Sequence, residues 1–426
     1  MSLASSETGF DLKSLYSDAI KDMQVYIMFR IAKKVADLTP GLVAKDRAPI
    51  KLSIGAPVID PPKVLLDVLK QAINTPGLHG YSTPKGEGFF LEAVQKRMQD
   101  RFGVVVNPKT EVMSLLGSKE GLANIFRALI TYKSNPAEQD VIMIPDPGYA
   151  SYQDSIQIAG GQTYAMRLTP ENDYKPDFED MLADMHTQGI QPERVKALVL
   201  CYPNAPIGAT CGLDYYEKAV AFCKKHHILL ISDLAYADVY FPGEEPPHSV
   251  LEIPGAMDVT LEFHSLSKPY SATGWRMGYA VGHADAIEAL ERVKGTVDSG
   301  MFKCVQKAAA FVMNSPECFE FALTQNKVYQ ENQAIMLKGF DELGWPIQNL
   351  SVPKATFYLW LPIPPWAASS EAFCDALLET SGIVTVPGTA FGQYGEGYFR
   401  MSLVDTQDKL HEAIARMKTD GFTFTR

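Results

Sequence analysis

Cysteine is scarce in this chain, with six residues among 426, and no two cysteines have the CxxC spacing of a zinc or redox motif. Six cysteines over this length are too few for the framework of a disulfide-stabilised domain. We therefore expect reduced thiols and a cytoplasmic protein. The eight histidines, which include His226, His227 and His264, also lack metal-ligand spacing. No metal site is therefore predicted.

Long apolar runs and an excess of positive charge are missing as well. No apolar stretch reaches about 18 residues, so no transmembrane helix is expected. The first thirty residues contain four acidic side chains and no unbroken apolar run, unlike a secretory signal. The formal net charge of −11 argues against a general surface for nucleic acid or anionic membranes.

What remains is the pattern of a large α/β protein. A chain of 426 residues exceeds the usual size of one core, so two lobes are expected. Short runs rich in Val, Ile and Leu alternate with amphipathic stretches such as LDYYEKAVAFCKKH, which indicates strands buried on both faces in a largely parallel sheet. The predicted strands of this part are 111–117, 140–146, 195–204, 227–233 and 259–268.

The C-terminal part has a different pattern. Residues 355–363 and 397–404 alternate with period two, typical of strands with one buried face. Helical patterns precede them, so we expect a smaller α+β lobe, with the N-terminal fifty residues packed against it. A long helix near residues 285–320 is predicted to join the two lobes.

Polar side chains follow five of the predicted strands, at the point where each strand ends. In an open parallel sheet the carboxyl ends of the strands share one edge, where ligands bind. Each residue alone has an ordinary explanation, since an aspartate after a strand is most often a helix N-cap. Their common position predicts a pocket, formed by Ser118 and Lys119, Tyr149, Asn204, Asp233 with Tyr236, and Lys268.

One group of residues suits an anion. The Gly117-Ser118 step at a predicted helix start offers free backbone N–H groups and a hydroxyl, which bind phosphate. Arg276 lies eight residues after Lys268 in the stretch SLSKPYSATGWRMGY and adds a charge-assisted contact. Ser265 adds a second hydroxyl.

A second group suits an aromatic aldehyde. Tyr149 offers a flat ring for stacking, Asp233 can hold a proton on a ring nitrogen, and Tyr236 can donate to a ring oxygen. Lys268 can form an imine with an aldehyde. A phosphate, a ring with a nitrogen and a phenolic oxygen, and an aldehyde together make pyridoxal phosphate, which the sequence therefore predicts as the cofactor.

The same segments resemble the signatures of the fold-type I pyridoxal-phosphate aminotransferases of class I/II. SLSKPYSATGWRMGY is similar to the family's Ser-x-x-Lys…Gly-x-Arg-x-Gly signature, SDLAYAD to its aspartate segment, LGSKEG to its phosphate-binding turn and DPGYASY to its stacking aromatic. The resemblance covers roughly residues 30 to 420. It implies the following roles: Lys268 as the Schiff-base lysine, Ser265 and Arg276 as phosphate ligands, Asp233 at the pyridine nitrogen, Tyr236 at the ring hydroxyl and Tyr149 as the stacking ring.

Three further roles follow only from the resemblance. Tyr81 in HGYSTPKG matches a tyrosine that reaches the phosphate of the neighbouring subunit, which implies a homodimer. Arg400 in GYFRMSLV matches the arginine that binds the substrate α-carboxylate. Gly55 in LSIGAP matches the backbone loop near that carboxylate, and Asn204 is a further candidate for contact with the substrate.

The resemblance also implies the fold. The family is α/β, with a large domain built on a mostly parallel seven-stranded sheet between helices and a smaller α+β domain. We expect an N-terminal arm with part of the small domain over residues 1–55, the large cofactor-binding domain over 56–300 and the small C-terminal domain over 301–426.

Within the family, EFHSLSK and DSGMFKCVQKAA resemble most the LL-diaminopimelate aminotransferases and the related alanine–glutamate transaminases. The chain departs from the family pattern in two places. The usual Asn-Pro-Thr-Gly reads Ala205-Pro206-Ile207-Gly208, so the family's ring-hydroxyl asparagine falls on Ala205, with Asn204 one position early. In addition, KGEGFFLEA replaces the common Gly-Ile-Pro-Glu-Leu-Arg.

Plainer explanations exist for several of these residues. Lys268, which precedes a proline, could be a solvated turn lysine, and Tyr149 could be ordinary core. Arg400 alternates with Tyr398 and could be an exposed strand residue in a surface ion pair. Asn204 could simply satisfy a turn.

The leading hypothesis is an amino-acid aminotransferase with Lys268, Asp233 and Tyr236 as catalytic residues. Its substrates would be an amino acid and a 2-oxo acid, possibly LL-diaminopimelate with 2-oxoglutarate, or alanine with glutamate. The same site could instead run a β- or γ-elimination, since one fold hosts several chemistries. A third hypothesis, a cofactor-binding regulator, would be supported by an appended basic helix-turn-helix, which the N-terminal residues do not contain.

Overall fold

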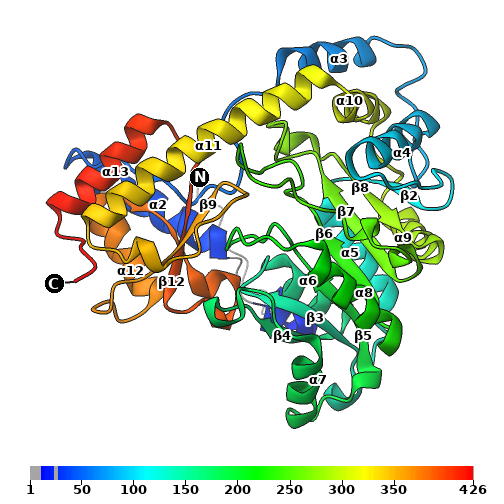
Figure 1. Ribbon diagram of the computed structural model, residues 1–426, viewed down its shortest axis with the longest axis horizontal. Helices are drawn as coiled ribbons and strands as arrows, with labels where there is room; N and C mark the ends of the chain where they lie inside the picture. The colour runs from blue at the N-terminus through cyan, green and yellow to red at the C-terminus, as the bar shows by residue number, and fades with distance from the viewer. Residues whose placement is uncertain (1–10, 24–26, 426) are drawn as a thin grey trace.

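The computed structural model describes residues 11–23 and 27–425 (Figure 1). Its largest sheet has seven strands in the order β2-β8-β7-β6-β5-β3-β4. Strand β8 pairs antiparallel with β2 and β7, and all other neighbours are parallel, which confirms the expected sheet. The strands are β2 (Val112–Leu115), β3 (Val141–Asp146), β4 (Gln162–Arg167), β5 (Val195–Leu200), β6 (Leu229–Asp233), β7 (Thr260–Ser265) and β8 (Gly278–Gly282).

Helices cover both faces of this sheet because its strands are apolar on both sides. Val141 and Met143 pack into one hydrophobic cluster, and Ile142 and Ile144 pack into another, as period-two alternation requires. The first cluster includes residues of α3 (Lys63–Ile73), α4 (Gly88–Phe102), α7 (Phe178–Thr187), α8 (Leu213–His226) and α10 (Lys303–Met313), and the second includes residues of α5 (Ser118–Leu129), α6 (Ser151–Ala159) and α9 (Ala284–Val297).

A second lobe is built on a three-stranded antiparallel sheet in the order β11-β12-β9. In β12, Phe399 and Met401 point into a hydrophobic cluster rich in aromatic side chains. The placing of the domain boundaries at residues 55 and 300 stays a prediction. The elements of this lobe are β9 (Tyr358–Pro362), β11 (Val386–Pro387), β12 (Tyr398–Ser402), α12 (Ser370–Ala376) and α13 (Gln407–Thr419), with β1 (Ile50–Lys51) and β10 (Ile383–Val384) paired beside it.

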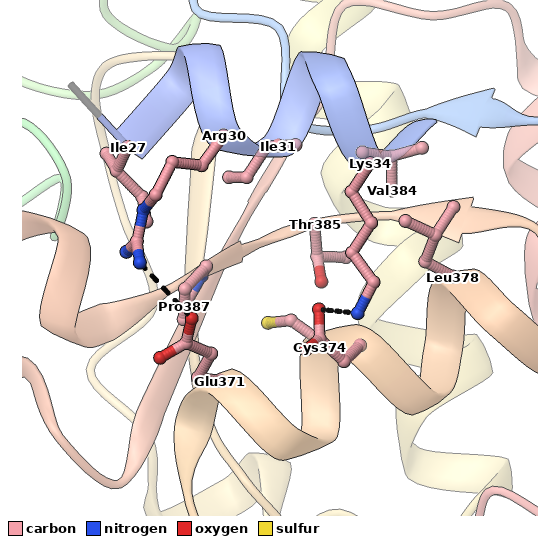
Figure 2. A pocket seen from close by; sticks show the side chains of 11 residues that line it. Ile27, Arg30, Ile31, Lys34, Glu371, Cys374, Leu378, Val384, Thr385 and Pro387 are labelled. Atoms are coloured by element: carbon pink, nitrogen blue, oxygen red, sulfur yellow. Dashed lines mark ion pairs between the residues drawn. The ribbon is translucent and has the colours of Figure 1, made fainter. Parts of the chain in front are cut away.

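The N-terminal segment contains α1 (Asp18–Asp22) and α2 (Ile27–Val43). Apolar residues of α2, such as Val35 and Leu42, pack on Leu378 and Val384. Figure 2 shows the small cavity of about 90 Å³ that remains between α2 and this lobe, bordered by an ion pair between Arg30 and Glu371 at 3.8 Å.

The single long helix predicted near residues 285–320 is wrong. Helix α9 ends before Gly300, whose φ of +90° is unsuitable for a helix and whose backbone lies so close to Thr83 O that a Cβ would be 2.2 Å away. Helix α10 then ends before Pro316, which begins α11 (Pro316–Glu342), a helix of 27 residues. Figure 1 shows α11 running from beside α10 to α13. No helix in the described ranges is both long and apolar enough to cross a bilayer.

Candidate active site

The turn between β2 and α5 forms a narrow cradle at the edge of the large sheet. Gly117 adopts φ +80°, and a Cβ there would lie 2.2 Å from a guanidinium nitrogen of Arg276. Arg276 donates to Leu116 O at 3.2 Å and to Thr273 O at 2.9 Å, so its charge is held at the start of α5 beside Ser118. A helix N-terminus next to an arginine is a favourable place for a phosphate.

Asp233, at the end of β6, is buried, and one of its two carboxylate oxygens is paired. Tyr152 donates to Oδ2 at 2.6 Å, and its own hydroxyl is fully enclosed. Burial raises the pKa of Asp233 to about 6, and the Tyr152 hydrogen bond partly offsets that rise. The Tyr149 ring packs edge-on against Tyr152 with centroids 5.6 Å apart, so Tyr149 is tied to the same group.

Lys268 follows β7 and points into the interior. Its Nζ donates to the backbone oxygen of Gly55 at 2.5 Å, which links the large sheet to the segment after β1. Burial lowers the pKa of Lys268, and the nearby cations Arg400 and Arg276 lower it further. A buried lysine of this kind is a neutral amine over a wider pH range, which excludes the solvated-turn explanation.

Arg400 is 6% exposed, so the explanation as a surface ion pair is wrong. Its guanidinium lies between two aromatic rings, 4.3 Å from the centroid of Tyr358 and 4.7 Å from that of Phe391. One nitrogen donates to Ser53 O at 2.9 Å. This arrangement holds the flat guanidinium in one orientation, as bidentate recognition of a carboxylate requires.

Tyr236 lies on the loop after β6 and is buried. Its hydroxyl is 3.0 Å from that of Tyr358, and burial raises the pKa of Tyr236 well above its ordinary value. Tyr236 is therefore a hydrogen-bond donor rather than a phenolate at neutral pH.

Asn204 is fully buried in the turn after β5. Its Oδ1 accepts the N–H of Ile207 at 3.1 Å, so the explanation as a turn residue is correct for this atom. Its Nδ2 is buried and finds no acceptor in the described part of the chain. Ala205 packs with its methyl group against the cluster that contains Tyr236. Asn204, rather than Ala205, therefore carries the available amide donor.

Tyr81 is separate from these residues in one chain. It lies between α3 and α4 with its side chain 88% exposed, and it shares no hydrogen bond or ion pair with the other candidate residues in the described ranges. A role for Tyr81 therefore depends on a second subunit.

Several buried polar atoms of the candidate residues and their neighbours have no partner within the described part of the chain. Asp233 Oδ1, Asn204 Nδ2, Ser267 Oγ and Arg400 Nε have no hydrogen-bond partner among the described residues. Buried polar groups are nearly always paired, so acceptor and donor atoms of a bound molecule are expected here. A carboxylate, an amide donor and the anion cradle at Gly117 fit the ring nitrogen, ring oxygen and phosphate of pyridoxal phosphate.

Three site residues escaped the sequence prediction: Tyr152, Tyr358 and Phe391. Tyr152 lies three residues after Tyr149, but Tyr149 precedes α6, so the two do not share a helix face and no helical spacing marked Tyr152. Tyr358 and Phe391 come from segments far from Lys268 in sequence, and no local pattern marks them.

Comparison with known proteins gives consistent matches. A family model described as aminotransferase class I and II matches residues 47–417. LL-diaminopimelate aminotransferase 2 of Trichormus variabilis is 41% identical, covering 96% of this chain and 100% of that protein. LL-diaminopimelate aminotransferase of Moorella thermoacetica is 38% identical over 94% and 96%. The substrate-bound BacF structure from Bacillus subtilis superposes with a TM-score of 0.87 at 32% identity, covering 96% of this chain and 98% of that one.

Proposed function

Because this chain belongs to the class I and II aminotransferases, which depend on pyridoxal 5′-phosphate, we propose that it transfers the amino group of LL-diaminopimelate to a 2-oxo acid, with 2-oxoglutarate as the acceptor. The observation that carries the proposal is the combination of a buried Lys268 amine with the aromatic-clamped Arg400 in one site. The names of the matched relatives support transamination over elimination and support LL-diaminopimelate over alanine as the amino donor.

The cofactor would be held by residues from several strand ends. Ser118 with the start of α5, Ser265 and Arg276 would bind the phosphate, and Lys119 lies 5.8 Å from the centroid of the Tyr149 ring at the same edge. Tyr149 would cover one face of the cofactor ring, as its position beside Tyr152 allows. The free oxygen of Asp233 would accept a hydrogen bond from the protonated ring nitrogen, and that contact would favour the ionised carboxylate.

When bound, pyridoxal phosphate supplies an aldehyde that combines with amines and a ring that accepts the electron pair released at Cα. Lys268 Nζ would take the proton from Cα of the amino acid as a base and would then deliver it, as an acid, to the carbon that was the aldehyde carbon of the cofactor. The depressed pKa of Lys268 suits both steps, because the group must be neutral first and protonated afterwards.

Arg400 would orient the substrate by its α-carboxylate. Its Nε is buried and unpaired among the described residues. The Gly55 backbone lies beside the guanidinium, and a Cβ added at Gly55 would be only 3.0 Å from Tyr358 Oη. A cleft of about 860 Å³ adjoins the site: Tyr149 and Phe391 line it, but Lys268, Asp233 and Arg400 do not.

The direct test is a coupled assay of the holoenzyme over a panel of donors with 2-oxoglutarate. We expect glutamate formation to be fastest with LL-diaminopimelate and much slower with alanine, aspartate or aromatic amino acids. Ammonia and an oxo acid released without any acceptor would instead identify a lyase. Faster turnover of alanine than of LL-diaminopimelate would refute the proposed donor.

The amide of Asn204 should tune the bound cofactor. Asn204→Ala is expected to raise the pKa of the bound cofactor, read from the visible spectrum of the holoenzyme, by about half a unit to one unit. The reason is that a neutral hydrogen bond contributes about 1 kcal/mol. Ala205→Asn should not lower that pKa, since its side chain would enter an apolar cluster. A spectrophotometric pH titration of both variants decides this. If Ala205→Asn lowers the pKa and Asn204→Ala leaves it unchanged, the donor position is residue 205.

We also propose a cytoplasmic homodimer. Two observations support Tyr81 as an interface residue. Its side chain is exposed, and a second exposed aromatic residue, Phe302 (46% exposed), lies near the same segment, with its ring centroid 6.2 Å from that of His79. Large exposed aromatic side chains commonly mark such surfaces. The molar mass in solution, measured by light scattering, tests the dimer, and cell fractionation tests the location, for which the scarcity of cysteine is the support.

A further inference from the structure

Tyr358 belongs to the small sheet, yet its side chain contacts groups from three other segments. Its hydroxyl lies 3.0 Å from that of Tyr236, and its ring lies beneath the guanidinium of Arg400 at 4.3 Å. An added Cβ at Gly55 would lie 3.0 Å from the same hydroxyl. Tyr358 is 2% exposed, so both its hydroxyl and its ring are enclosed by the protein.

The backbone before Tyr358 is fixed to the loop that carries Tyr236. The N–H of Thr356 donates to Val239 O at 2.7 Å, and Tyr240 pairs with Ala355 in an isolated bridge. Thr356 has φ +69°, a costly conformation for a β-branched residue that persists only where the surroundings impose it. The start of β9 is therefore held in register with the segment after β6.

We propose that Tyr358 is a positioning residue that couples the carboxylate site at Arg400 to the cofactor's phenolic oxygen through Tyr236. The inference rests on the proposed function of the site. Tyr236 would donate its only hydroxyl proton to the cofactor oxygen, so the hydroxyl of Tyr358 must donate to Tyr236. A hydroxyl that accepts a hydrogen bond becomes a stronger donor, because linked hydrogen bonds polarise one another.

The ring of Tyr358 also holds the guanidinium of Arg400 in place. Together with Phe391 it confines the guanidinium of Arg400, and the Nε of that guanidinium, unpaired among the described residues, stays available to a substrate carboxylate. A guanidinium that is held flat loses less freedom when it forms two parallel hydrogen bonds. One side chain thus orders both the group that binds the substrate and a group that binds the cofactor.

A double-mutant cycle on the holoenzyme tests the hydroxyl. The charged or titratable side chains facing Tyr358 in the described part of the chain are Tyr236, Lys268, Arg400 and Tyr329. Tyr358→Phe is expected to raise the pKa of the bound cofactor, read from the visible spectrum, by about half a unit, because the hydrogen bond that polarises Tyr236 is lost. In a Tyr236→Phe background the same change should give no further shift. Equal shifts in both backgrounds would overturn the proposal, since they would mean that Tyr358 does not act through Tyr236.

Glutarate, a dicarboxylic acid without an amino group, tests the ring. Tyr358→Phe should bind glutarate as the parent does, whereas Tyr358→Leu should bind it about 10-fold more weakly through loss of the cation–π contact. Tyr215→Phe removes a buried hydroxyl of the large lobe that donates to Pro176 O at 3.0 Å, and it should change neither readout. Equal glutarate affinity of the Phe and Leu variants would overturn the role of the ring.

These readouts are independent of turnover. A holoenzyme that shows the expected non-additive shift but transfers no amino group would refute the proposed function alone. An active aminotransferase with additive shifts would refute only the role of Tyr358.

Discussion

Lys268→Ala is expected to lower transamination by at least about 10³-fold while the protein stays folded and still binds pyridoxal phosphate. The reason is that Lys268 supplies, beside Gly55, the buried amine whose pKa burial lowers. Loss of its hydrogen bond to Gly55 should cost only about 1 kcal/mol of folding free energy. The measurements are turnover in the coupled assay, the visible spectrum and thermal unfolding.

Chemical rescue makes this test sharper. A small primary amine added to Lys268→Ala should restore part of the rate, and the pH dependence of the rescued rate should follow the pKa of the added amine. In the parent the neutral fraction of Lys268 rises at lower pH than for an ordinary lysine, because burial depresses its pKa. Lys224→Ala, a surface variant that loses only the ion pair with Asp258, is the control and should keep full activity. Near-normal turnover of Lys268→Ala would remove Lys268 from the mechanism.

Arg400→Ala is expected to reduce kcat/KM by about 100-fold or more, while cofactor affinity changes little. A charged bidentate contact contributes a few kcal/mol, and its loss acts only on ligands that have a carboxylate. Arg400→Lys should be intermediate, since an ammonium keeps the charge but not the planar fork. The measurement is the ratio of kcat/KM for the best amino acid to that for the amine lacking its carboxylate, and this ratio should collapse in Arg400→Ala.

A second buried arginine controls for the cost of removing such a side chain. Arg416, in α13, is 5% exposed and donates to Ala48 O at 2.9 Å and Ser381 O at 3.0 Å, away from the site. Arg416→Ala should lower the melting temperature but leave the preference for the carboxylate unchanged. If Arg400→Ala bound amino and oxo acids as tightly as the parent, another group would hold the carboxylate.

The sequence by itself determined five of the seven strands of the large sheet and supplied the candidates for the reacting groups. These five strands are largely buried on both faces, so they appear as continuous apolar runs, and β2, β3, β5, β6 and β7 lie inside the predicted ranges. Lys268, Asp233 and Arg276 were identifiable because each lies within a few residues of a strand end or a turn, so their surroundings are encoded locally. Strand β8 was missed because its run Gly278–Gly282 is short and begins and ends with glycine, and strand β4 was missed because its run Gln162–Arg167 begins and ends with polar residues that are not buried.

Only the tertiary structure decided how the two lobes meet. Tyr358 lies 122 residues from Tyr236, and Gly55 lies 213 residues from Lys268, so no window of sequence contains both members of either pair. Period-two alternation placed Arg400 opposite the apolar face of β12, but it could not show that Tyr358 and Phe391 cover that second face as well. Likewise, the pattern Asn204-Ala205 left open which of the two positions can offer a hydrogen-bond donor. Packing decides this, because Ala205 lies against the apolar cluster around Tyr236, whereas the amide nitrogen of Asn204 is buried without a partner among the described residues.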